Sequence, residues 1–282
     1  MYLKRSFAVI GGDTRQSRLV RQLRGLGYSA GAYRVPDLED SAPDLSGCVQ
    51  SADILVLPMP ALAAPDVIRT ADGGVPLHAL LRAAKPDALI CGGMLGAAEN
   101  ALRVQEFRFF DYAKDEILLL ENAELTAEAA LPLLLERLSG PLAGSRVLIC
   151  GFGRIGKLLA RKLCALGADV SVSARKPAAL ALARILGLRT EQTGIRDSGL
   201  AQYDAIVNTV PAEILSASQL ACVRQDCVLL ELASLPGGFC SEAQARPGYL
   251  AARGLPGRYA PDAAAAIIRR AIFRELRLEE TP

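Results

Sequence analysis

Three glycines with the spacing GxGxxG are the clearest chemical signal in the sequence. They follow an apolar run at 147–150 and open an amphipathic segment. In this context the first glycine allows a tight turn, the second lets a pyrophosphate approach the backbone, and the third lets a helix pack closely on a strand. The N–H groups at the start of that helix attract anions. We therefore predict a dinucleotide-binding loop formed by Gly151, Phe152, Gly153, Arg154, Ile155 and Gly156.

The end of the next strand predicts which dinucleotide binds. Enzymes that use NAD usually place Asp or Glu there, against the ribose hydroxyls. This chain instead has Ser173, Ala174, Arg175 and Lys176. A hydroxyl and two cations suit a 2′-phosphate, because a guanidinium makes charge-assisted hydrogen bonds to phosphate oxygens. A solvated basic loop is the alternative, and we predict NADP(H) as the cofactor.

An earlier copy of the same strand–turn–helix–strand pattern lies at 7–33 and lacks a usable phosphate loop. Gly11 stands for the first glycine of the motif, but Asp13 and Gln16 replace the other two. A carboxylate at that position repels a pyrophosphate. We therefore expect the chain to hold one dinucleotide, bound by the second copy of the pattern.

The two copies of the strand–turn–helix–strand pattern predict sheets whose strands run parallel. Strands that alternate with helices predict an α/β fold with right-handed crossovers. At roughly 150 residues per domain, a chain of 282 residues corresponds to about two domains. We predict two doubly wound Rossmann-like domains with a cleft between them: a substrate domain at 1–125 and an NADP-binding domain at 126–261. The C-terminal helix, within 262–282, is a candidate addition to the first domain.

Other elements follow from apolar runs and capping residues. Further strands are predicted at 54–57, 88–91, 205–208 and 228–232. A long helix is predicted over 126–138, with Thr126 as its N-cap and Glu128 in its first turn. The Ser-Gly-Pro sequence that follows is expected to end this helix.

Composition excludes several classes of protein. The 32 Lys and Arg residues nearly balance the 30 Asp and Glu residues, so the net charge of +2 supports neither nucleic-acid nor membrane-surface binding. The apolar stretches are too short and too often broken by proline to span a bilayer, and the N-terminus does not resemble a signal peptide. The 7 cysteines lack zinc-ligand spacing. We expect a reduced, cytoplasmic protein with a small-molecule partner.

One reaction class is disfavoured by the absence of a suitable histidine. Hydroxy-acid dehydrogenases of this two-domain layout need a histidine in the second half of the chain to exchange the alcohol proton. The single histidine here, His78, lies among leucines in the first half. Proton transfer therefore falls to carboxylates, tyrosine, lysine, water or the substrate itself.

Several separate stretches together carry a resemblance to a known family. They are IGGDTRQ at 10–16, ADILVLPMP at 52–60, FDYAKDE and ENAELTAEAA within 110–130, VLICGFGRIGKLLA at 147–160, VNTVPAEIL at 207–215, LASLPGG at 232–238 and GLPGRYAPDAAAAII at 254–268. Together they resemble the A subunit of dipicolinate synthase, an enzyme family of sporulating bacteria whose members oxidise dihydrodipicolinate to dipicolinate. The stretch at 61–76 matches this family poorly.

The resemblance implies an NADP-dependent oxidoreductase for dipicolinate biosynthesis in sporulation, with the B subunit of dipicolinate synthase as a partner. A homo-oligomer is a further candidate assembly. Two loops that follow strands of the nucleotide domain are then expected to border the nicotinamide and its ribose. Their residues are Asn208, Thr209, Val210 and Pro211 in the first loop, and Ala233 and Ser234 in the second.

The implied substrate carries two carboxylates, so its site needs cations. Arg15, after the first strand, is the leading candidate, and Lys114 and Arg258 are weaker ones. Asn122 and Thr126 are further candidates because they lie at the expected start of the long helix.

No residue stands out as the base that removes the substrate proton. Asp13 and Glu128 are hypotheses for this role. Since the product is aromatic, the reaction needs only a weak base, and the enzyme would act chiefly by holding the ring carbon against the nicotinamide.

Two other functions fit the same residues. The first is an NADP-dependent imine or amino-acid dehydrogenase built like alanine or saccharopine dehydrogenase. The second is a protein that binds the nucleotide without catalysing a reaction. Substrate turnover distinguishes these from the leading interpretation.

Overall fold

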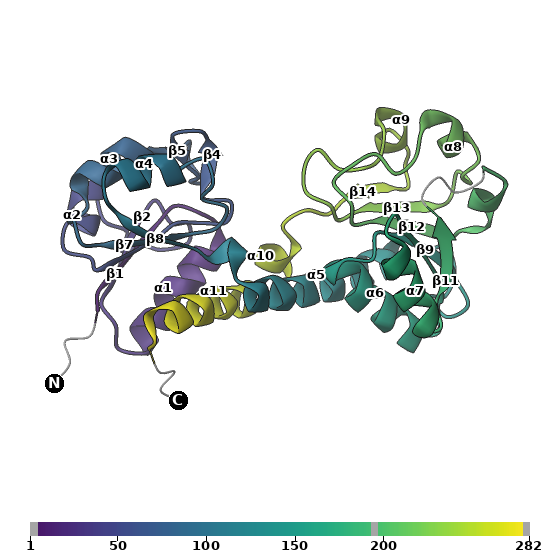
Figure 1. Ribbon diagram of the computed structural model, residues 1–282, viewed down its shortest axis with the longest axis horizontal. Helices are drawn as coiled ribbons and strands as arrows, with labels where there is room; N and C mark the ends of the chain where they lie inside the picture. The colour runs from purple at the N-terminus through teal and green to yellow at the C-terminus, as the bar shows by residue number, and fades with distance from the viewer. Residues whose placement is uncertain (1–4, 193–196, 279–282) are drawn as a thin grey trace. The chain divides into compact units, whose positions relative to one another are not determined.

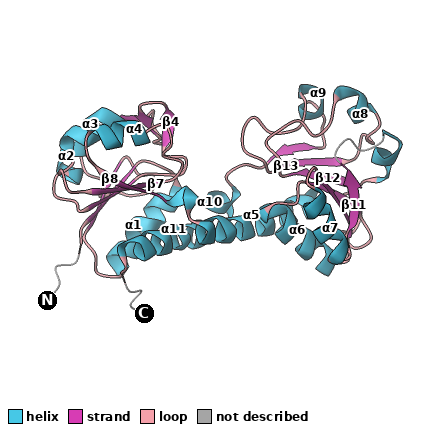
Figure 2. Cartoon of the chain, viewed as in Figure 1, coloured by secondary structure: helices cyan, strands magenta, loops and turns pink. Residues whose placement is uncertain are grey.

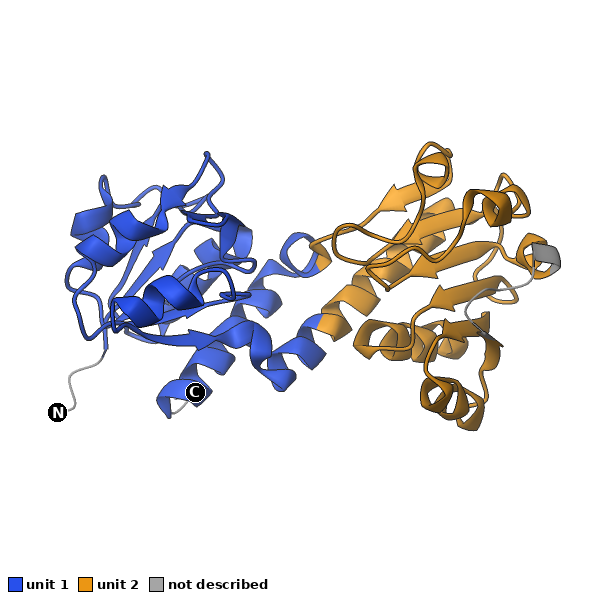
Figure 3. Cartoon of the chain, turned by 45° about the horizontal axis from the view of Figure 1, so that its top comes forward, with its two compact units in different colours: residues 1–122, 256–282 blue, residues 123–255 orange. Residues whose placement is uncertain are grey.

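A computed structural model describes residues 5–192 and 197–278 of the chain (Figure 1). The chain divides into two compact units, Met1–Asn122 with Pro256–Pro282, and Ala123–Leu255 (Figure 3). Each unit is built on a parallel sheet with helices against it (Figure 2). The predicted α/β fold class, with two doubly wound parallel sheets, is confirmed.

The sheet of the first unit has five parallel strands in the order β2-β1-β3-β7-β8. Helices α2 (Leu45–Val49), α3 (Leu77–Ala83) and α4 (Glu99–Val104) pack on one face. The strands are β1 (Phe7–Ile10), β2 (Ala30–Tyr33), β3 (Ile54–Val56), β7 (Leu89–Gly92) and β8 (Arg108–Asp111).

The C-terminal helix α11 (Pro261–Leu276) belongs to the first unit and packs against α1 (Thr14–Gly25). An aromatic cluster joins α11 to the sheet: the ring centroid of Phe273 lies 6.4 Å from that of Phe7 and 5.5 Å from that of Tyr28. Burial of these rings against each other gives α11 its place in this unit's core.

A small antiparallel sheet is inserted between β3 and α3. It consists of β4 (Leu62–Ala64), β5 (Val67–Ile68) and β6 (Val75–Pro76) in that order. Ile68 and Val75 are paired across it, and both are buried in the core of the unit. The insertion corresponds to the stretch at 61–76 that matches the family poorly.

The second unit has six parallel strands in the order β11-β10-β9-β12-β13-β14, the strand order of dinucleotide-binding Rossmann domains. The strands are β9 (Arg146–Cys150), β10 (Asp169–Ala174), β11 (Arg189–Gln192), β12 (Ala205–Asn208), β13 (Val228–Glu231) and β14 (Tyr249–Ala251).

Alternate residues of β9 point to opposite faces of this sheet, as the pleat requires. Val147 and Ile149 belong to a core with α5 (Glu116–Arg137), α6 (Arg154–Ala165) and α7 (Pro177–Ile185). Leu148 and Cys150 belong to the core on the other face. That face is covered by the 3₁₀ helix η2 (Asp197–Gln202), α8 (Ala217–Ala221) and α9 (Ser241–Gln244).

The long helix differs from its predicted bounds. α5 begins at Glu116 rather than at residue 126, and the division between the two units falls inside it. The prediction of Thr126 as an N-cap is wrong, because Thr126 is buried in the helix interior. Asp115 occupies the capping position instead, where its Oδ1 accepts a hydrogen bond from the N–H of Leu118 at 2.9 Å.

Two short elements complete the described chain, the 3₁₀ helix η1 (Tyr112–Lys114) and α10 (Leu255–Tyr259). Within 5–192 and 197–278, no helix is both long enough and apolar enough to cross a membrane.

Asp115 supports a prediction about acid stability. Burial raises the pKa of its carboxyl, but the Leu118 N–H and the Arg274 guanidinium, whose Nη2 lies 2.9 Å away, outweigh this and bring the pKa below its ordinary value. A lowered pKa stabilises the folded state above the unfolded pKa of about 4, and this contribution is lost as the pH falls through the folded pKa.

We therefore expect Asp115→Asn to lower the free energy of unfolding by up to about 1 kcal/mol at pH 7. The wild type and the variant should converge below about pH 4, as measured by urea unfolding at several pH values. Asp87→Asn, at an exposed carboxyl, is the control and should behave like the wild type. A difference that persists unchanged at pH 3 would contradict the argument.

Candidate cofactor and substrate sites

A hollow of about 390 Å³ lies at the carboxyl ends of the strands in the second unit. Loops after β9, β10 and β12 line it, at 150–153, 173–176 and 209–214, together with Ala179 of α7. The strand order reverses between β9 and β12, and open α/β sheets bind ligands outside such a reversal. The hollow brings together most of the residues predicted to contact the cofactor.

The three glycines of the loop after β9 are required for different physical reasons. Gly151 has φ +101°, and a Cβ there would lie 2.3 Å from Thr209 Oγ1. Gly156 lets α6 approach the turn, since a Cβ there would lie 2.1 Å from the carbonyl oxygen of Gly151. Gly153 is the N-cap of α6 and has no side chain that could bind the helix N–H groups. These N–H groups are therefore suited to an external anion such as a pyrophosphate.

The charged residues around the hollow fit the ribose end of a dinucleotide. Arg175 and Lys176 are exposed and line it, and Ser173 is buried beside them at the end of β10. Glu213 also lines the hollow. Two cations against one carboxylate leave a net positive charge, which favours binding of a phosphate group.

The remaining residues of the glycine loop lie outside this lining. Arg154 is exposed at the start of α6, and Ile155 is half-buried and packs on the core of the unit. Phe152 does line the hollow, but its side chain is largely in the core. The predicted contacts of this loop therefore rest on its backbone rather than on these side chains.

A buried hydrogen bond between Asn208 and Glu231 joins the two loops predicted to border the nicotinamide. Asn208 is fully buried, and its Nδ2 donates to Val210 O and to Glu231 Oε1, at 2.8 Å in each case. Thr209 Oγ1 donates to Cys150 O at 2.9 Å. Ala233 is buried and Ser234 is exposed, and neither lines the hollow. The Asn208 side chain therefore orders the loop, while Thr209, Val210 and Pro211 line the hollow itself.

Glu231 is a functional candidate that the sequence reasoning missed. It ends β13 with no exposed surface, and its two carboxylate oxygens accept hydrogen bonds from the N–H groups of Ala233 at 3.0 Å and Gly238 at 2.7 Å. A carboxylate inside the apolar run CVLLELAS was the available signal, because a buried charge must be compensated.

Asp13 and Arg15 lie together in the first unit, where they bind each other. Asp13 is the N-cap of α1, and the nearest contact between the two side chains joins Arg15 Nη2 to Asp13 Oδ2 at 2.7 Å. Arg15 is 8% exposed and also donates to Met59 O at 3.0 Å. Burial raises the pKa of Asp13, but hydrogen bonds and the charge of Arg15 hold it below its ordinary value. Asp13 is thus a weak base, and the charge of Arg15 is largely balanced.

Two other predicted substrate residues of the first unit are exposed. Lys114 pairs with Glu99, with 2.5 Å between Nζ and Oε1, and Arg258 lies on α10. The backbone next to Arg258 approaches the Arg15 side chain, since a Cβ at Gly257 would lie 3.0 Å from Arg15 Nε. Lys114 and Arg258 are thus both exposed to solvent, and Lys114 is held in an ion pair with Glu99.

The candidates on α5 lie within the helix rather than at its start. Asn122 is half-buried and Thr126 is buried. Glu128 faces Lys162 of α6, with 3.5 Å between Oε1 and Nζ, and Glu124 pairs with the same lysine. An ion pair between α5 and α6 is therefore the contact that the structure gives the predicted base Glu128.

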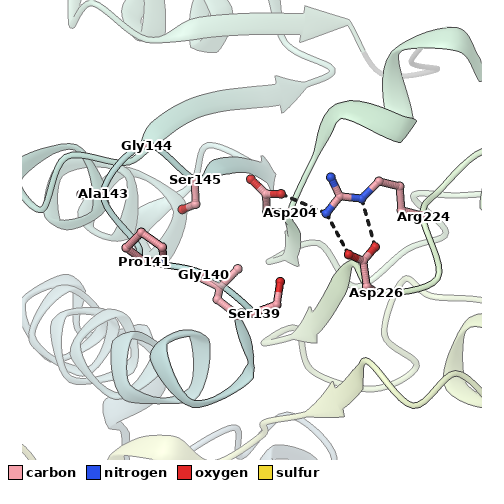
Figure 4. A pocket seen from close by; sticks show the side chains of 10 residues that line it. Ser139, Gly140, Pro141, Ala143, Gly144, Ser145, Asp204, Arg224 and Asp226 are labelled. Carbon is pink, nitrogen blue, oxygen red and sulfur yellow. Dashed lines mark hydrogen bonds and ion pairs between the residues drawn. The ribbon is translucent and has the colours of Figure 1, made fainter.

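A further hollow, of about 270 Å³, lies at the opposite edge of the second unit's sheet (Figure 4). It is bounded by 138–145 and by Arg224, which binds the carboxylates of Asp204 and Asp226, with 3.0 Å for the shortest contact to each. These charges satisfy one another, and the amino edge of a parallel sheet is not where such folds bind ligands. The hollow at the carboxyl edge remains the cofactor candidate.

Comparison with known proteins gives two family matches. Residues 6–113 match the family described as the N-terminal domain of the dipicolinate synthase A subunit. Residues 134–234 match the family described as "D-isomer specific 2-hydroxyacid dehydrogenase, NAD binding domain".

Relatives match the chain over nearly its full length. The dipicolinate synthase A subunit of Bacillus subtilis is 29% identical over 97% of each chain. A crystal structure of the dipicolinate synthase A chain from Bacillus subtilis has a TM-score of 0.83 at 27% identity, covering 98% of this chain and 97% of that one. The structure of the A subunit from Bacillus halodurans has the same TM-score at 24% identity, covering 99% and 98%.

The glycine loop, the strand order and the NAD-binding family match define an oxidoreductase-type protein that binds a nicotinamide cofactor. The predicted resemblance is confirmed across both units. The chain is similar to dipicolinate synthase A subunits over nearly its whole length.

Proposed function

We propose that this chain oxidises dihydrodipicolinate to dipicolinate with hydride transfer to NADP, as the A subunit of a cytoplasmic dipicolinate synthase that supplies dipicolinate to spores. The B subunit of such a synthase is the proposed partner. The observation that carries the proposal is the hollow at 150–153, 173–176 and 209–214, with an open N-cap at Gly153 and two exposed cations, in a chain related to dipicolinate synthase A subunits along its full length.

Bound NADP would accept a hydride at its nicotinamide ring. The residues of the chain hold the cofactor: the start of α6 binds the pyrophosphate, and Arg175 and Lys176 bind the 2′-phosphate. Asn208 and Glu231 fix the loops beside the nicotinamide through their hydrogen bonds to each other and to the backbone. Positioning is the main contribution of the protein, because aromatisation of the ring drives the reaction.

The proton lost by the substrate needs an acceptor, and we retain Asp13 and Glu128 as the proposed carboxylates. Both are held in ion pairs, with Arg15 and Lys162 respectively. The lowered pKa of Asp13 makes it a weak base, which is compatible with a product whose aromaticity favours proton release.

The test is the absorbance of dipicolinate and NADPH when the purified chain and NADP or NAD receive freshly generated dihydrodipicolinate, with and without the candidate B subunit. Product formation with NADP preferred over NAD supports the proposal. Turnover of an imine or amino acid instead would favour an amino-acid dehydrogenase. NADPH binding without turnover of any substrate would favour a non-catalytic role.

Arg175 should set the preference between the two cofactors. Since charge-assisted hydrogen bonds contribute about 1.5–3 kcal/mol, Arg175→Ala should raise the KM for NADP about tenfold or more and leave the KM for NAD nearly unchanged. Steady-state kinetics with both cofactors measure this. Arg161→Ala, at an exposed arginine of α6 outside the hollow, should leave both values as in the wild type. An equal effect of Arg175→Ala on NADP and NAD would refute the 2′-phosphate contact.

A further inference from the structure

We propose that Arg69 binds a carboxylate of the substrate in a hollow of about 370 Å³ in the first unit, at the carboxyl ends of β1, β2 and β3. The proposal rests on the proposed function, which requires a site for a dianionic ring. Residues of the loops after these three strands line the hollow, at 12–15, Pro36 and 58–59, and the segment 69–71 from the inserted sheet closes it.

The position of this hollow in the fold is that of a ligand site. The strand order β2-β1-β3-β7-β8 reverses direction between β1 and β3, and doubly wound sheets bind ligands outside the carboxyl ends of the strands at such a reversal. In the second unit the cofactor hollow occupies the equivalent place. The first unit thus offers a second hollow of similar size, without a phosphate loop.

The start of α1, at the edge of this hollow, is already satisfied by its own residues. Asp13 accepts a hydrogen bond from the N–H of Arg15 at 3.0 Å, and the Asp13 N–H donates to Gln16 Oε1 at 3.0 Å. The equivalent position in α6, Gly153, has no side-chain cap. An anion in the first unit must therefore find its main partner elsewhere.

The charges in the lining single out Arg69. Among the lining residues Asp13, Arg15 and Arg69 are charged, and the first two bind each other at 2.7 Å. Arg69 is exposed, and its guanidinium has no hydrogen bond or ion pair with the residues that the structure describes. The lining therefore has one net positive charge on a side chain that is open to a ligand, and a carboxylate is the group that matches it.

The backbone of Arg69 is fixed to the floor of the hollow even though its side chain is exposed. Its N–H donates to Ala61 O at 2.9 Å, and its carbonyl accepts from the N–H of Gly12 at 3.0 Å. Gly11, with φ +66°, permits this approach, because a Cβ there would lie 2.2 Å from Arg69 O. The inserted sheet thus holds Arg69 against the turn that follows β1, as a binding residue requires.

Arg15 then has a different role from the substrate-binding one predicted from the sequence. Arg15 lines the hollow, but it is buried and bound to Asp13 and Met59 O, so it shapes and supports the loops. Arg69 comes from the stretch at 61–76, where the resemblance to the family is weakest, so the family motifs do not point to it.

Calorimetric titration of the full-length protein with dipicolinate and with uncharged pyridine-2,6-dicarboxamide tests the proposal. Arg69→Ala should weaken dipicolinate binding about tenfold or more, leave diamide and NADPH binding unchanged, and raise the KM for dihydrodipicolinate. Arg69→Lys should restore part of the loss. Arg82→Ala, at an exposed arginine of α3 in the same unit, is the matched control and should bind dipicolinate like the wild type.

The thermal unfolding midpoint of Arg69→Ala should stay close to that of the wild type, because the exposed guanidinium makes no hydrogen bond or ion pair with the described residues and only its charge acts on Asp13. Wild-type affinity of this variant for dipicolinate, or no dipicolinate binding by the wild type, overturns the inference. Arg69-dependent dipicolinate binding without turnover would leave the site standing and refute the proposed function. Normal turnover of dihydrodipicolinate with an unchanged KM in Arg69→Ala would support the proposed function and refute the Arg69 site.

Discussion

Gly153→Ala should lower the affinity for NADPH at least tenfold while lowering the thermal unfolding midpoint by only about 1–4 °C, the cost of alanine at an N-cap. A Cβ at this position meets no atom within 4 Å, and the φ of −82° suits any residue. The fold therefore accepts the methyl group. The cofactor should not, since the second glycine of the motif is the point where the pyrophosphate approaches the backbone.

Gly156→Ala is the matched variant, with the same chemical change three residues later and a different expected result. Its Cβ would lie 2.1 Å from Gly151 O and 3.1 Å from Gly151 C. Both are backbone atoms, so α6 itself must shift, at a cost of about 1–3 kcal/mol as for other overpacked sites. This variant should lose both stability and NADPH binding.

Thermal unfolding and fluorescence titration with NADPH, applied to both variants, separate the two effects. The pair distinguishes a loop that binds a ligand from a turn that only packs. If Gly153→Ala binds NADPH as tightly as the wild type does, the start of α6 is not the pyrophosphate site, and the cofactor assignment in the second unit fails.

The parts of the fold that could be predicted are those set by local pattern. The run at 205–208 is an apolar segment with sharp ends, and β12 has the same bounds, Ala205–Asn208. The strand–glycine–helix order also predicts the parallel sheets, because a tight turn and an amphipathic segment leave few other arrangements. These signals lie within a few residues of the elements that they define.

The start of α5 could not be predicted in the same way, because two good capping signals compete. Thr126 and Glu128 have the residue types of a helix start, yet Asp115 is the residue that caps α5. Helix formers from 116 to 125 let the helix continue through Thr126, whose burial shows that tertiary packing decides the outcome.

The same contrast between local motifs and long-range contacts applies to the candidate sites. The residues at 173–176 were predictable because they follow a recognisable motif at a fixed distance. Arg69 was not, since its place beside Gly12 depends on a backbone hydrogen bond between the inserted sheet and the turn after β1. Asp13 and Arg15 were predicted separately, as a base and as a substrate-binding cation, and only the structure shows that their side chains bind each other.

Glu231→Gln should have the largest effect on the nucleotide unit. The carboxylate has no exposed surface. Asn208 Nδ2 and Ala233 N donate to Oε1 at 2.8 and 3.0 Å, and Gly238 N donates to Oε2 at 2.7 Å. An amide has one oxygen, so its NH₂ group must face a donor. Each buried group left unpaired costs about 1–3 kcal/mol, and we expect the free energy of unfolding to fall by about that amount or more.

Urea unfolding and steady-state kinetics provide the measurement. Glu242→Gln, the same change at an exposed carboxylate of α9, should stay within about 0.5 kcal/mol of the wild type. Because Glu231 ties the loop at 233–239 to Asn208, Glu231→Gln should also raise the KM for NADP more than it lowers kcat, and Glu231→Asp should not rescue it.

A double-mutant cycle separates a specific bond from general packing. If Glu231 acts through Asn208, the effects of Glu231→Gln and Asn208→Ala should be less than additive, with a coupling of about 0.5–3 kcal/mol. Additive effects would mean that the two residues stabilise the unit independently. In that case Glu231 would order its own loop through the N–H groups of Ala233 and Gly238, and its link to Asn208 would have no part in positioning the cofactor.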